Sequence, residues 1–434
     1  MKISNYVIVF EREGLYFLYN TSTQAFFRIN DIDYQGITKV ITGKMDITGL
    51  SEKFIDFLKV KHCIDTNNDK SAHDFCVKME YRKRFESFSG RTLSLVIAPT
   101  LVCNFACPYC YQSNLPSFVM SEEVEEDIVR FIRSYEEVCD NLEICWEGGE
   151  PLIAFETIKS LYSKIETQTT LNIKGHAIVT NGYLRTPEIC SFFKEKSLQS
   201  AQITIDGNPD THNKSRVLKS GKPTYDTILR NIDMLTEEHP SCKVIVRTNI
   251  HNGNKDEYGS LYSELNMRWN GKNVHLSPAF VISNEECEVS CCSPREKSEF
   301  LLSLKNKFHT GKFCNVPELQ TGRCSATAEH SYIIDPQGNL YKCWNDIGKE
   351  QYCVGNVKDG LNNNRLIATY VIGSDKYSDP ECLKCKLFPI CDGGCNKQRM
   401  DNVESGTHNI LCPFDETGIC DELYEYYKSM KHAD

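Results

Sequence analysis

Three cysteines stand close together in one short stretch of the chain. Cys103, Cys107 and Cys110 have the spacing C-x3-C-x2-C, and an aromatic residue, Tyr109, directly precedes the third. Three thiolates bind three corners of a [4Fe–4S] cluster and leave the fourth iron open for a substrate or cofactor, as an open zinc position does. A zinc site would instead show C-x2-C pairs with a fourth ligand close by, and a disulfide needs no third cysteine. The spacing therefore predicts an iron–sulfur cluster with one open iron.

This stretch resembles the signature of the radical S-adenosylmethionine (radical SAM) enzymes. The resemblance implies that the open iron chelates the amino and carboxylate groups of SAM, and that electron transfer cleaves SAM to a 5′-deoxyadenosyl radical. It also implies that the backbone around Tyr109 packs near the adenine ring.

A second group of cysteines occupies the C-terminal third, in the pattern C-x13-G-x4-C, then C-x2-C-x5-C-x3-C, then one more cysteine. This pattern resembles in full the SPASM domain of radical SAM enzymes, which binds two auxiliary [4Fe–4S] clusters. The resemblance assigns Cys382, Cys385, Cys391 and Cys412 to the distal cluster, and Cys324, Cys343 and Cys395, with Cys314 as the candidate fourth ligand, to the cluster nearer SAM. We therefore expect three [4Fe–4S] clusters and SAM as cofactors. Two zinc sites are the alternative, because zinc ribbons share the C-x2-C pair.

Composition limits the class of protein. The chain has 434 residues, a net charge of −10 and 22 cysteines. The negative charge disfavours nucleic-acid binding through bulk electrostatics, and no apolar run approaches the ~18 residues that span a membrane. The N-terminal stretch lacks the small-residue cleavage site of a signal peptide, so we expect a cytoplasmic protein. The remaining cysteines, including Cys287, Cys291 and Cys292 after the sixth strand, are expected to be free thiols in a reducing cytosol. Contact of these three with substrate or a cluster is the alternative, and Cys420 is a spare candidate ligand near Cys412.

The elements that must position the first three cysteines form a repeating pattern. Six apolar strands are predicted at Leu93–Ala98, Leu142–Trp146, His176–Thr180, Ala201–Ile205, Lys243–Asn249 and Val274–Phe280. Helices are predicted between and after them, at Ser121–Val138, Phe155–Thr167, Pro187–Lys196, Tyr225–Glu238, Asp256–Met267 and Arg295–Phe308. Strand–helix alternation indicates a parallel sheet with right-handed crossovers. Six units rather than eight favour a partial (βα)6 barrel, the radical SAM core, with its active site at the carboxyl ends of the strands.

Polar residues follow several of these strands. Gly148, Gly149 and Glu150 come after the second strand and resemble the GGE-type segment that holds the SAM amino group, with glycines that permit close backbone approach. By the same resemblance, Thr204 and Arg216 after the fourth strand contact the SAM carboxylate or ribose.

Arg247, on the fifth strand, is the alternative to Arg216. None of the strand ends carries the Ser–His–Asp or paired-carboxylate arrangement of hydrolases.

Residues 1–88 are predicted to form a small α+β unit. Strands are expected at Tyr6–Glu11, Leu15–Tyr19 and Gln24–Ile29, helices at Ile32–Ile41 and Ser51–Lys61, and a polar linker with a helical part at 66–90. This order resembles the winged-helix-like RiPP recognition element, which binds the leader of a ribosomally made, post-translationally modified peptide as an added strand. A structural cap on the catalytic domain is the alternative.

The expected domains are thus 1–88, a recognition domain and linker, 89–310, a radical SAM core, and 311–434, a SPASM domain. That order is typical of peptide maturases, so we expect an oxidoreductase that abstracts hydrogen from a precursor peptide and installs an intrapeptide C–C or thioether cross-link. Its expected partners are a precursor with an N-terminal leader and an electron donor such as flavodoxin or ferredoxin.

Two other functions stay open. Anaerobic sulfatase maturases, which make formylglycine, carry a catalytic Asp directly after the cysteine of the G-x4-C element. Here that position is Trp344, and Asp346, two residues further, is the candidate base. A non-catalytic electron-transfer protein is the alternative of another class, which the GGE segment and the first cysteine motif disfavour.

Overall fold

The computed structural model describes residues 1–65, 70–112, 115–281, 289–308, 316–322, 324–409, 412–413 and 415–431. Two compact units divide the chain. We call Gly90–Cys292 with Ala328–Ala368 the barrel unit, and Met1–Ser89 with Ser293–Thr327 and Thr369–Asp434 the terminal unit. None of the helices in the described ranges combines the length and apolar composition needed to cross a bilayer.

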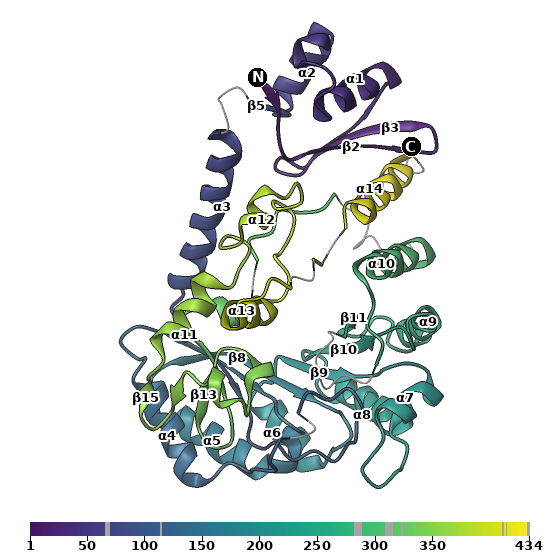
Figure 1. Ribbon diagram of the computed structural model, residues 1–434. Coiled ribbons are helices and arrows are strands. Elements are labelled where there is room, and N and C mark those ends of the chain that lie inside the picture. The colour runs from purple at the N-terminus through teal and green to yellow at the C-terminus, as the bar shows by residue number, and fades with distance from the viewer. Residues whose placement is uncertain are drawn as a thin grey trace. The chain divides into compact units, whose positions relative to one another are not determined.

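The barrel unit is built on a parallel sheet (Figure 1). Its six strands appear in the spatial order β11-β10-β9-β8-β7-β6 and are β6 (Thr92–Ile97), β7 (Asn141–Trp146), β8 (Asn172–Thr180), β9 (Ser200–Thr204), β10 (Lys243–Ile250) and β11 (Val274–Phe280). The connecting helices are α4 (Glu122–Arg133), α5 (Phe155–Gln168), α6 (Pro187–Glu195), α7 (Pro209–Ser215), α8 (Tyr225–Glu238) and α9 (Tyr258–Arg268). The predicted α/β fold with six parallel strands is confirmed.

Four short strands from the C-terminal part of the sequence extend this sheet beyond β6. They are β12 (Ser331–Ile334), which runs parallel to β6, and then the antiparallel strands β13 (Asn339–Tyr341), β14 (Gly355–Asn356) and β15 (Gly360–Leu361). The short helices η5 (Trp344–Asp346), η6 (Glu350–Tyr352) and α11 (Asn364–Ala368) complete this segment. The G-x4-C element of the sequence is therefore part of the barrel sheet.

Side chains alternate between the two faces of the parallel strands. On β7, Leu142, Ile144 and Trp146 are buried on one face of the strand, whereas Glu143 and Cys145 are exposed or half-buried on the opposite face, which we call the inner face. A hydrogen bond of 2.7 Å from Ser94 Oγ on β6 to the Glu143 carboxylate supports this assignment. Since successive strand residues point to opposite faces, the residue after Trp146 continues the inner row.

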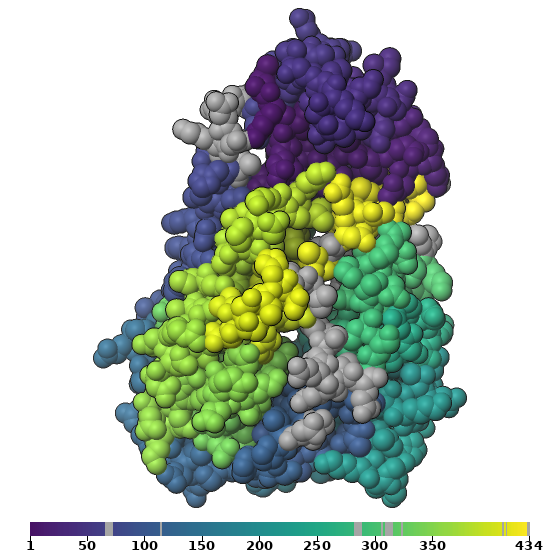
Figure 2. Space-filling model, viewed as in Figure 1, coloured from purple at the N-terminus to yellow at the C-terminus, as the bar shows by residue number. Residues whose placement is uncertain are grey.

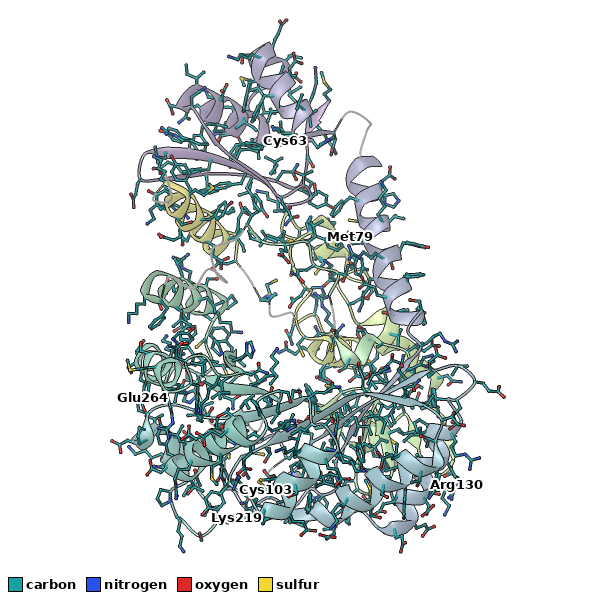
Figure 3. The ribbon with its side chains drawn as sticks, turned by 180° about the vertical axis from the view of Figure 1, so that it is seen from behind. Cys63, Met79, Cys103, Arg130, Lys219 and Glu264 are labelled. Atoms are coloured by element: carbon teal, nitrogen blue, oxygen red, sulfur yellow. The ribbon has the colours of Figure 1, made fainter. Side chains whose placement is uncertain are left out.

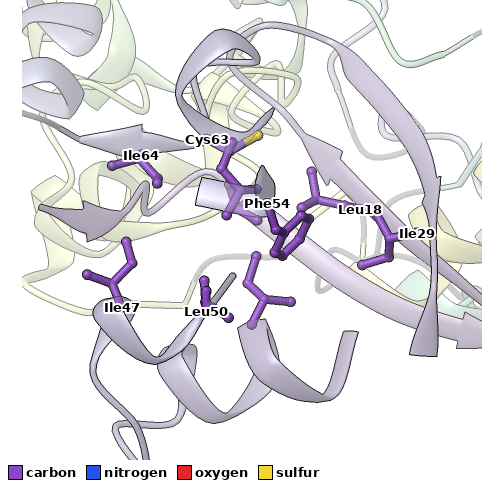
Figure 4. Close-up of a cluster of buried hydrophobic side chains, with 10 residues drawn as sticks. Leu18, Ile29, Ile47, Leu50, Phe54, Cys63 and Ile64 are labelled. Carbon is purple, nitrogen blue, oxygen red and sulfur yellow. The ribbon is translucent and has the colours of Figure 1, made fainter. Parts of the chain in front are cut away.

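In the terminal unit, a three-stranded antiparallel sheet comes first. It consists of β2 (Val7–Arg12), β3 (Leu15–Asn20) and β4 (Ala25–Ile29), with β3 in the centre. One face packs on α1 (Asp31–Ile41) and α2 (Glu52–Val60), around a cluster that includes Leu18, Phe54 and Leu58 (Figure 4). The remaining elements here are β1 (Lys2–Ile3), η1 (Ile47–Gly49) and β5 (Ile64–Asp65). The strands and helices expected in this part of the sequence are present.

The other face of this sheet packs against the last helix of the chain, α14 (Glu416–Lys431). Phe10 and Phe17 form one buried cluster with Ile419, Leu423 and Tyr424. Figure 2 shows the yellow C-terminal atoms directly against the purple N-terminal atoms. Residues 1–89 are therefore packed into the terminal unit rather than standing apart from it.

Helices from three parts of the sequence complete the terminal unit. They are α3 (Lys70–Phe88), α10 (Pro294–Phe308), η4 (Ser325–Thr327), η7 (Thr369–Gly373), α12 (Pro380–Lys384) and α13 (Asn396–Ser405). Lys83 Nζ on α3 donates to Thr327 Oγ1 at 2.6 Å, and Arg295 on α10 pairs with Asp421 on α14 at 3.2 Å. The helix α10 thus belongs to the same compact unit as the two ends of the chain. The three-part division at residues 88 and 310 was drawn from motifs and stays a prediction.

Candidate active site

The first cysteine motif lies in the loop that follows β6, at the carboxyl ends of the parallel strands. We call Cys103, Cys107 and Cys110 the loop cysteines. Backbone hydrogen bonds join this loop to the segment after α7, from Ala106 N to Val217 O at 2.9 Å and from Lys219 N to Asn104 O at 2.8 Å. Figure 3 labels Cys103 and Lys219, which lie near each other in the barrel unit. The loop is therefore held by the connection between β9 and α8.

The glycine pair after β7 runs directly against the chain that leads into Cys103. Gly149 N donates to Thr100 O at 3.1 Å, and Glu150 N donates to Val102 O at 2.9 Å. A Cβ atom on either glycine would lie 2.4 Å from a backbone oxygen, Thr100 O for Gly148 and Val102 O for Gly149. Gly148 also has a φ of +133°, which L side chains rarely adopt. Both positions require glycine because two backbone segments meet there.

Glu150 is fully buried beside this contact. One carboxylate oxygen accepts hydrogen bonds from Thr180 Oγ1 at 2.7 Å and Leu152 N at 3.1 Å, and the other accepts from Asn181 N at 2.7 Å. Burial raises the pKa of Glu150, and these hydrogen bonds with the nearby Arg216 oppose the rise. The side chain therefore fastens the end of β8 to the glycine turn, and its contact with the SAM amino group stays a prediction.

Arg216 approaches the loop cysteines from the other side. Its guanidinium donates to Tyr109 Oη at 2.9 Å and lies 5.6 Å from the centre of the Phe105 ring. Burial lowers the pKa of Arg216, but nearby Tyr109, Cys107 and Asp206 raise it by more than burial lowers it, so the net change is upward. Of the two arginine candidates, the structure brings Arg216 to the cysteine loop.

Arg247 and Thr204 lie side by side in register on β10 and β9. Arg247 Nε donates to Asn249 Oδ1 at 2.8 Å, and Thr204 is buried at the end of its strand. The predicted contacts of Thr204 and Arg216 with SAM remain predictions.

Asp206 is a site residue that the sequence interpretation missed. It is fully buried, accepts a hydrogen bond from Tyr109 Oη, and lies 3.8 Å from Arg216. Asn249 N donates to its other oxygen at 2.8 Å. The segment Thr204-Ile-Asp206-Gly207 contained the signal, because a lone Asp directly after an apolar strand stands at the active edge of a parallel sheet.

The chemistry of the loop cysteines suits an iron–sulfur cluster. Burial raises the pKa of Cys107 to about 11, and Cys103 and Cys110 are its electrostatic neighbours. Within the described ranges, no three His, Cys, Asp or Glu side chains converge closely enough to hold one metal ion. Each iron of a [4Fe–4S] cluster takes one cysteine sulfur from the protein, so the three cysteines need not converge on one point. Metal binding would deprotonate their thiols. The residues present therefore fit a [4Fe–4S] cluster.

The C-terminal cysteines are distributed over both units. Cys343 lies in the barrel unit as an electrostatic neighbour of Tyr111, whereas Cys324, Cys382, Cys385, Cys391, Cys395 and Cys412 belong to the terminal unit. Cys314 and Cys287 lie outside the described residues. The assignment of these cysteines to two auxiliary clusters stays a prediction.

Two buried cations lie beside the cysteines proposed for the distal cluster. Arg399 donates to Cys382 Sγ at 3.1 Å and to Asp379 Oδ2 at 2.9 Å. Lys376 Nζ donates to Cys391 O at 2.8 Å, and Cys382 and Cys391 are electrostatic neighbours. Positive charge and N–H donors at sulfur are the contacts by which proteins adjust iron–sulfur centres.

Asp346, the candidate base, is fully buried at the end of η5, where its backbone N–H donates to Cys343 O at 3.0 Å. Trp344, which occupies the position of the maturase aspartate, is 41% exposed. The role of Asp346 as a base stays a prediction.

The comparisons with known proteins agree with this fold. Residues 97–264 match the family model of the radical SAM superfamily. The cysteine-type anaerobic sulfatase-maturating enzyme of Clostridium novyi is 23% identical over 359 residues, 74% of this chain and 93% of that protein. The radical SAM cyclopropyl synthase TigE of Paramaledivibacter caminithermalis is 23% identical over 359 residues, 74% of this chain and 70% of that protein.

Solved structures show the same fold. That of native anSMEcpe with bound AdoMet and Kp18Cys peptide has a TM-score of 0.58 at 19% identity and covers 79% of this chain and 98% of that one. That of Streptococcus suis SuiB bound to precursor peptide SuiA has a TM-score of 0.55 at 16% identity and covers 95% of this chain and 99% of that one.

The chain therefore contains a radical SAM domain with the radical SAM α/β fold, and it is an enzyme. SAM and a [4Fe–4S] cluster are the cofactors that this domain uses.

Proposed function

We propose that this enzyme acts on a ribosomally made precursor peptide with an N-terminal leader and installs an intrapeptide C–C or thioether cross-link. The observation that carries the proposal is the extent of the likeness to SuiB, a structure solved with a precursor peptide, which covers 95% of this chain. The anSMEcpe structure covers 79%. The similarity to a cyclopropyl synthase supports bond formation within a peptide, since a cyclopropane ring requires a new C–C bond.

The chain's own residues would position the cofactors. The loop cysteines would hold the cluster whose open iron binds SAM. Gly148 and Gly149 would let SAM approach the backbone closely, and Arg216 would neutralise the SAM carboxylate. When bound, cluster and SAM supply one-electron chemistry that removes a hydrogen atom from an unactivated carbon. The C-terminal cysteines would hold two auxiliary [4Fe–4S] clusters that accept an electron, and flavodoxin or ferredoxin would reduce the enzyme.

The leader would bind the N-terminal sheet by strand addition. In the described ranges β2 and β4 each pair with β3 alone, so each has one open edge. We favour β4, because Ala25, Phe26 and Phe27 are only partly buried, whereas half of the residues of β2 are buried. Phe27 packs on Phe57 of α2 and would border a pocket for a leader side chain.

Hydrogen exchange of the full-length protein tests this binding mode. The full chain is needed because a protein that starts near Arg91 would lose the strands that cover α14. The ligand is the leader half of a candidate precursor, to be identified by searching the open reading frames beside the gene for a short peptide. We expect slower amide exchange in β4 with the leader than with a scrambled peptide. Unchanged exchange in β4 would leave residues 1–88 as a structural cap.

Formylglycine formation is the second candidate, favoured by the sequence similarity to sulfatase-maturating enzymes over 74% of this chain. The two products are distinguishable. A cross-link lowers the peptide mass by about two hydrogens and prevents the linked segment from fragmenting, as expected for a radical step followed by oxidation. Formylglycine carries an aldehyde, so a hydrazide reagent labels it and leaves a cross-linked peptide unlabelled. A hydrazide-labelled product would replace the first proposal with the second.

A further inference from the structure

Glu147, directly after β7, is a half-buried acid that is neither a predicted cofactor contact nor a predicted cluster ligand. It follows Glu143 and Cys145 in the inner row of β7, and its backbone N–H donates to Ile97 O at 3.0 Å. The glycine pair begins at the next residue. Its side chain therefore lies inside the barrel, at the end of the sheet that carries the loop cysteines.

The two oxygens of this carboxyl group have different surroundings. Oε1 accepts a hydrogen bond from Tyr111 Oη at 3.2 Å, and Tyr111 is in turn contacted by Gln112 Nε2 at 3.3 Å. Oε2 is buried and has no hydrogen-bond partner among the residues that the structure describes. Glu150, three positions further, has both oxygens satisfied. An acid kept for structure alone would be expected to resemble Glu150, because an unmet buried oxygen costs free energy.

Among the described residues, three titratable or charged groups act on Glu147. They are Tyr111 from the loop after β6, Arg247 from β10 and Cys145 from β7 itself. Arg247 Nε donates to Asn249 Oδ1. Burial raises the pKa of Glu147, the Tyr111 hydrogen bond and Arg247 lower it, and the net pKa is about 7. Such a carboxyl group can both take and release a proton near neutral pH.

We propose that Glu147 is the catalytic base that takes the proton which the peptide loses when its cross-link forms. The inference rests on the proposed function. When bound, the cluster and SAM would supply the radical that removes a hydrogen atom from one C–H bond of the peptide. An S–H partner would give its proton to Glu147 Oε2 as the C–S bond forms, whereas a C–H partner would give it up only after the carbon radical has added to that carbon. The one electron left over would go to an oxidised auxiliary [4Fe–4S] cluster, so atoms and electrons balance.

The main test is the Glu147→Gln variant, which keeps the shape and the acceptor for Tyr111 but cannot take a proton. Glu143→Gln is the matched control, since Glu143 lies four residues earlier in the same inner row and bonds to Ser94. The reconstituted enzymes are compared with SAM, dithionite and the precursor peptide. We expect Glu147→Gln to retain its iron and its SAM cleavage but to cross-link about 10²- to 10⁴-fold more slowly, the usual contribution of a general base. Glu143→Gln should cross-link at the wild-type rate.

The pH profile separates a base from a structural group. Glu147 must be deprotonated to act, so wild-type cross-linking should rise with pH through about 7, the pKa that burial gives Glu147, and this rise should vanish in Glu147→Gln. Tyr111→Phe removes the hydrogen bond that lowers the pKa of Glu147, so the rise should move to higher pH. In the infrared spectrum of the reconstituted enzyme, a protonated-carboxyl band should disappear over the same range and be missing in Glu147→Gln.

Cross-linking by Glu147→Gln at the wild-type rate, or an unshifted rise in Tyr111→Phe, would overturn the assignment. If Glu147→Gln loses its iron, the pH–rate profile of Tyr111→Phe and the wild-type infrared band decide whether Glu147 is the base. Failure of the proposed function would look different, because the wild-type enzyme itself would then yield no cross-linked peptide. Asp346→Asn tests the other acid, and loss of the pH-dependent rise in that variant while Glu147→Gln keeps it would assign the base to Asp346.

Discussion

Replacing Gly149 with alanine should separate the glycine turn from the cysteine loop. The added Cβ atom would lie 2.4 Å from Val102 O and 2.6 Å from Leu101 O, both backbone atoms of the segment entering Cys103. Ordinary contact begins near 3.4 Å, so the two segments must move apart by about 1 Å. No flexible side chain can absorb this shift, and the displacement would therefore be transmitted to the first cluster ligand.

A misplacement of about 1 Å at reacting groups can lower a rate about 10²-fold. We therefore expect Gly149→Ala to cleave SAM about 10²-fold more slowly than wild type, while the rest of the fold survives. The assay is 5′-deoxyadenosine formation by the reconstituted, dithionite-reduced enzyme, together with its iron content. Gly90→Ala is the control, because a Cβ at Gly90 meets nothing within 4 Å. Wild-type SAM cleavage by Gly149→Ala would refute the close-approach argument.

Three further predictions concern the loop cysteines, Arg399 and Phe17. Replacing all three loop cysteines with alanine should remove about four iron per chain and abolish 5′-deoxyadenosine formation, and residual SAM cleavage would reject the ligand assignment. Arg399→Gln removes a buried cation that donates to Cys382 Sγ, so the reduction potential of the proposed distal cluster should fall in an EPR-monitored titration. Arg399→Lys should lower this potential less. Equal reduction potentials in the wild type and Arg399→Gln would show that the contact does not adjust the cluster. Phe17→Ala should lower the free energy of unfolding by about 3–5 kcal/mol in denaturant titrations, since Phe17 is fully buried between its sheet and α14, and a loss below about 1 kcal/mol would contradict that packing.

The barrel could be predicted from the sequence because its signals are local. Each strand is a short apolar run, and α4 begins at a capping residue, Ser121, whose side chain accepts from Val124 N at 3.4 Å. Parallel order then follows from the alternation of strands and helices. The glycine turn was also recognisable, although the backbone contact that requires both glycines is visible only in the structure.

Contacts between distant parts of the sequence could not be predicted. The packing of Phe17 against Tyr424 joins residues at opposite ends of the chain, and the sequence around either residue gives no signal that identifies its partner. The extension of the sheet by β12 escaped notice because its four residues give too short a pattern. Glu147 was not predicted as a site residue, because its unmet oxygen depends on what surrounds it in three dimensions.

The most direct test of the account is the anaerobic reaction of the reconstituted, reduced full-length enzyme with SAM and a precursor peptide identified among the open reading frames beside its gene. The account predicts 5′-deoxyadenosine in step with a peptide that is lighter by about two hydrogens per cross-link, as a radical step followed by oxidation requires. An iron-loaded, reduced enzyme that leaves both SAM and the peptide intact would contradict it.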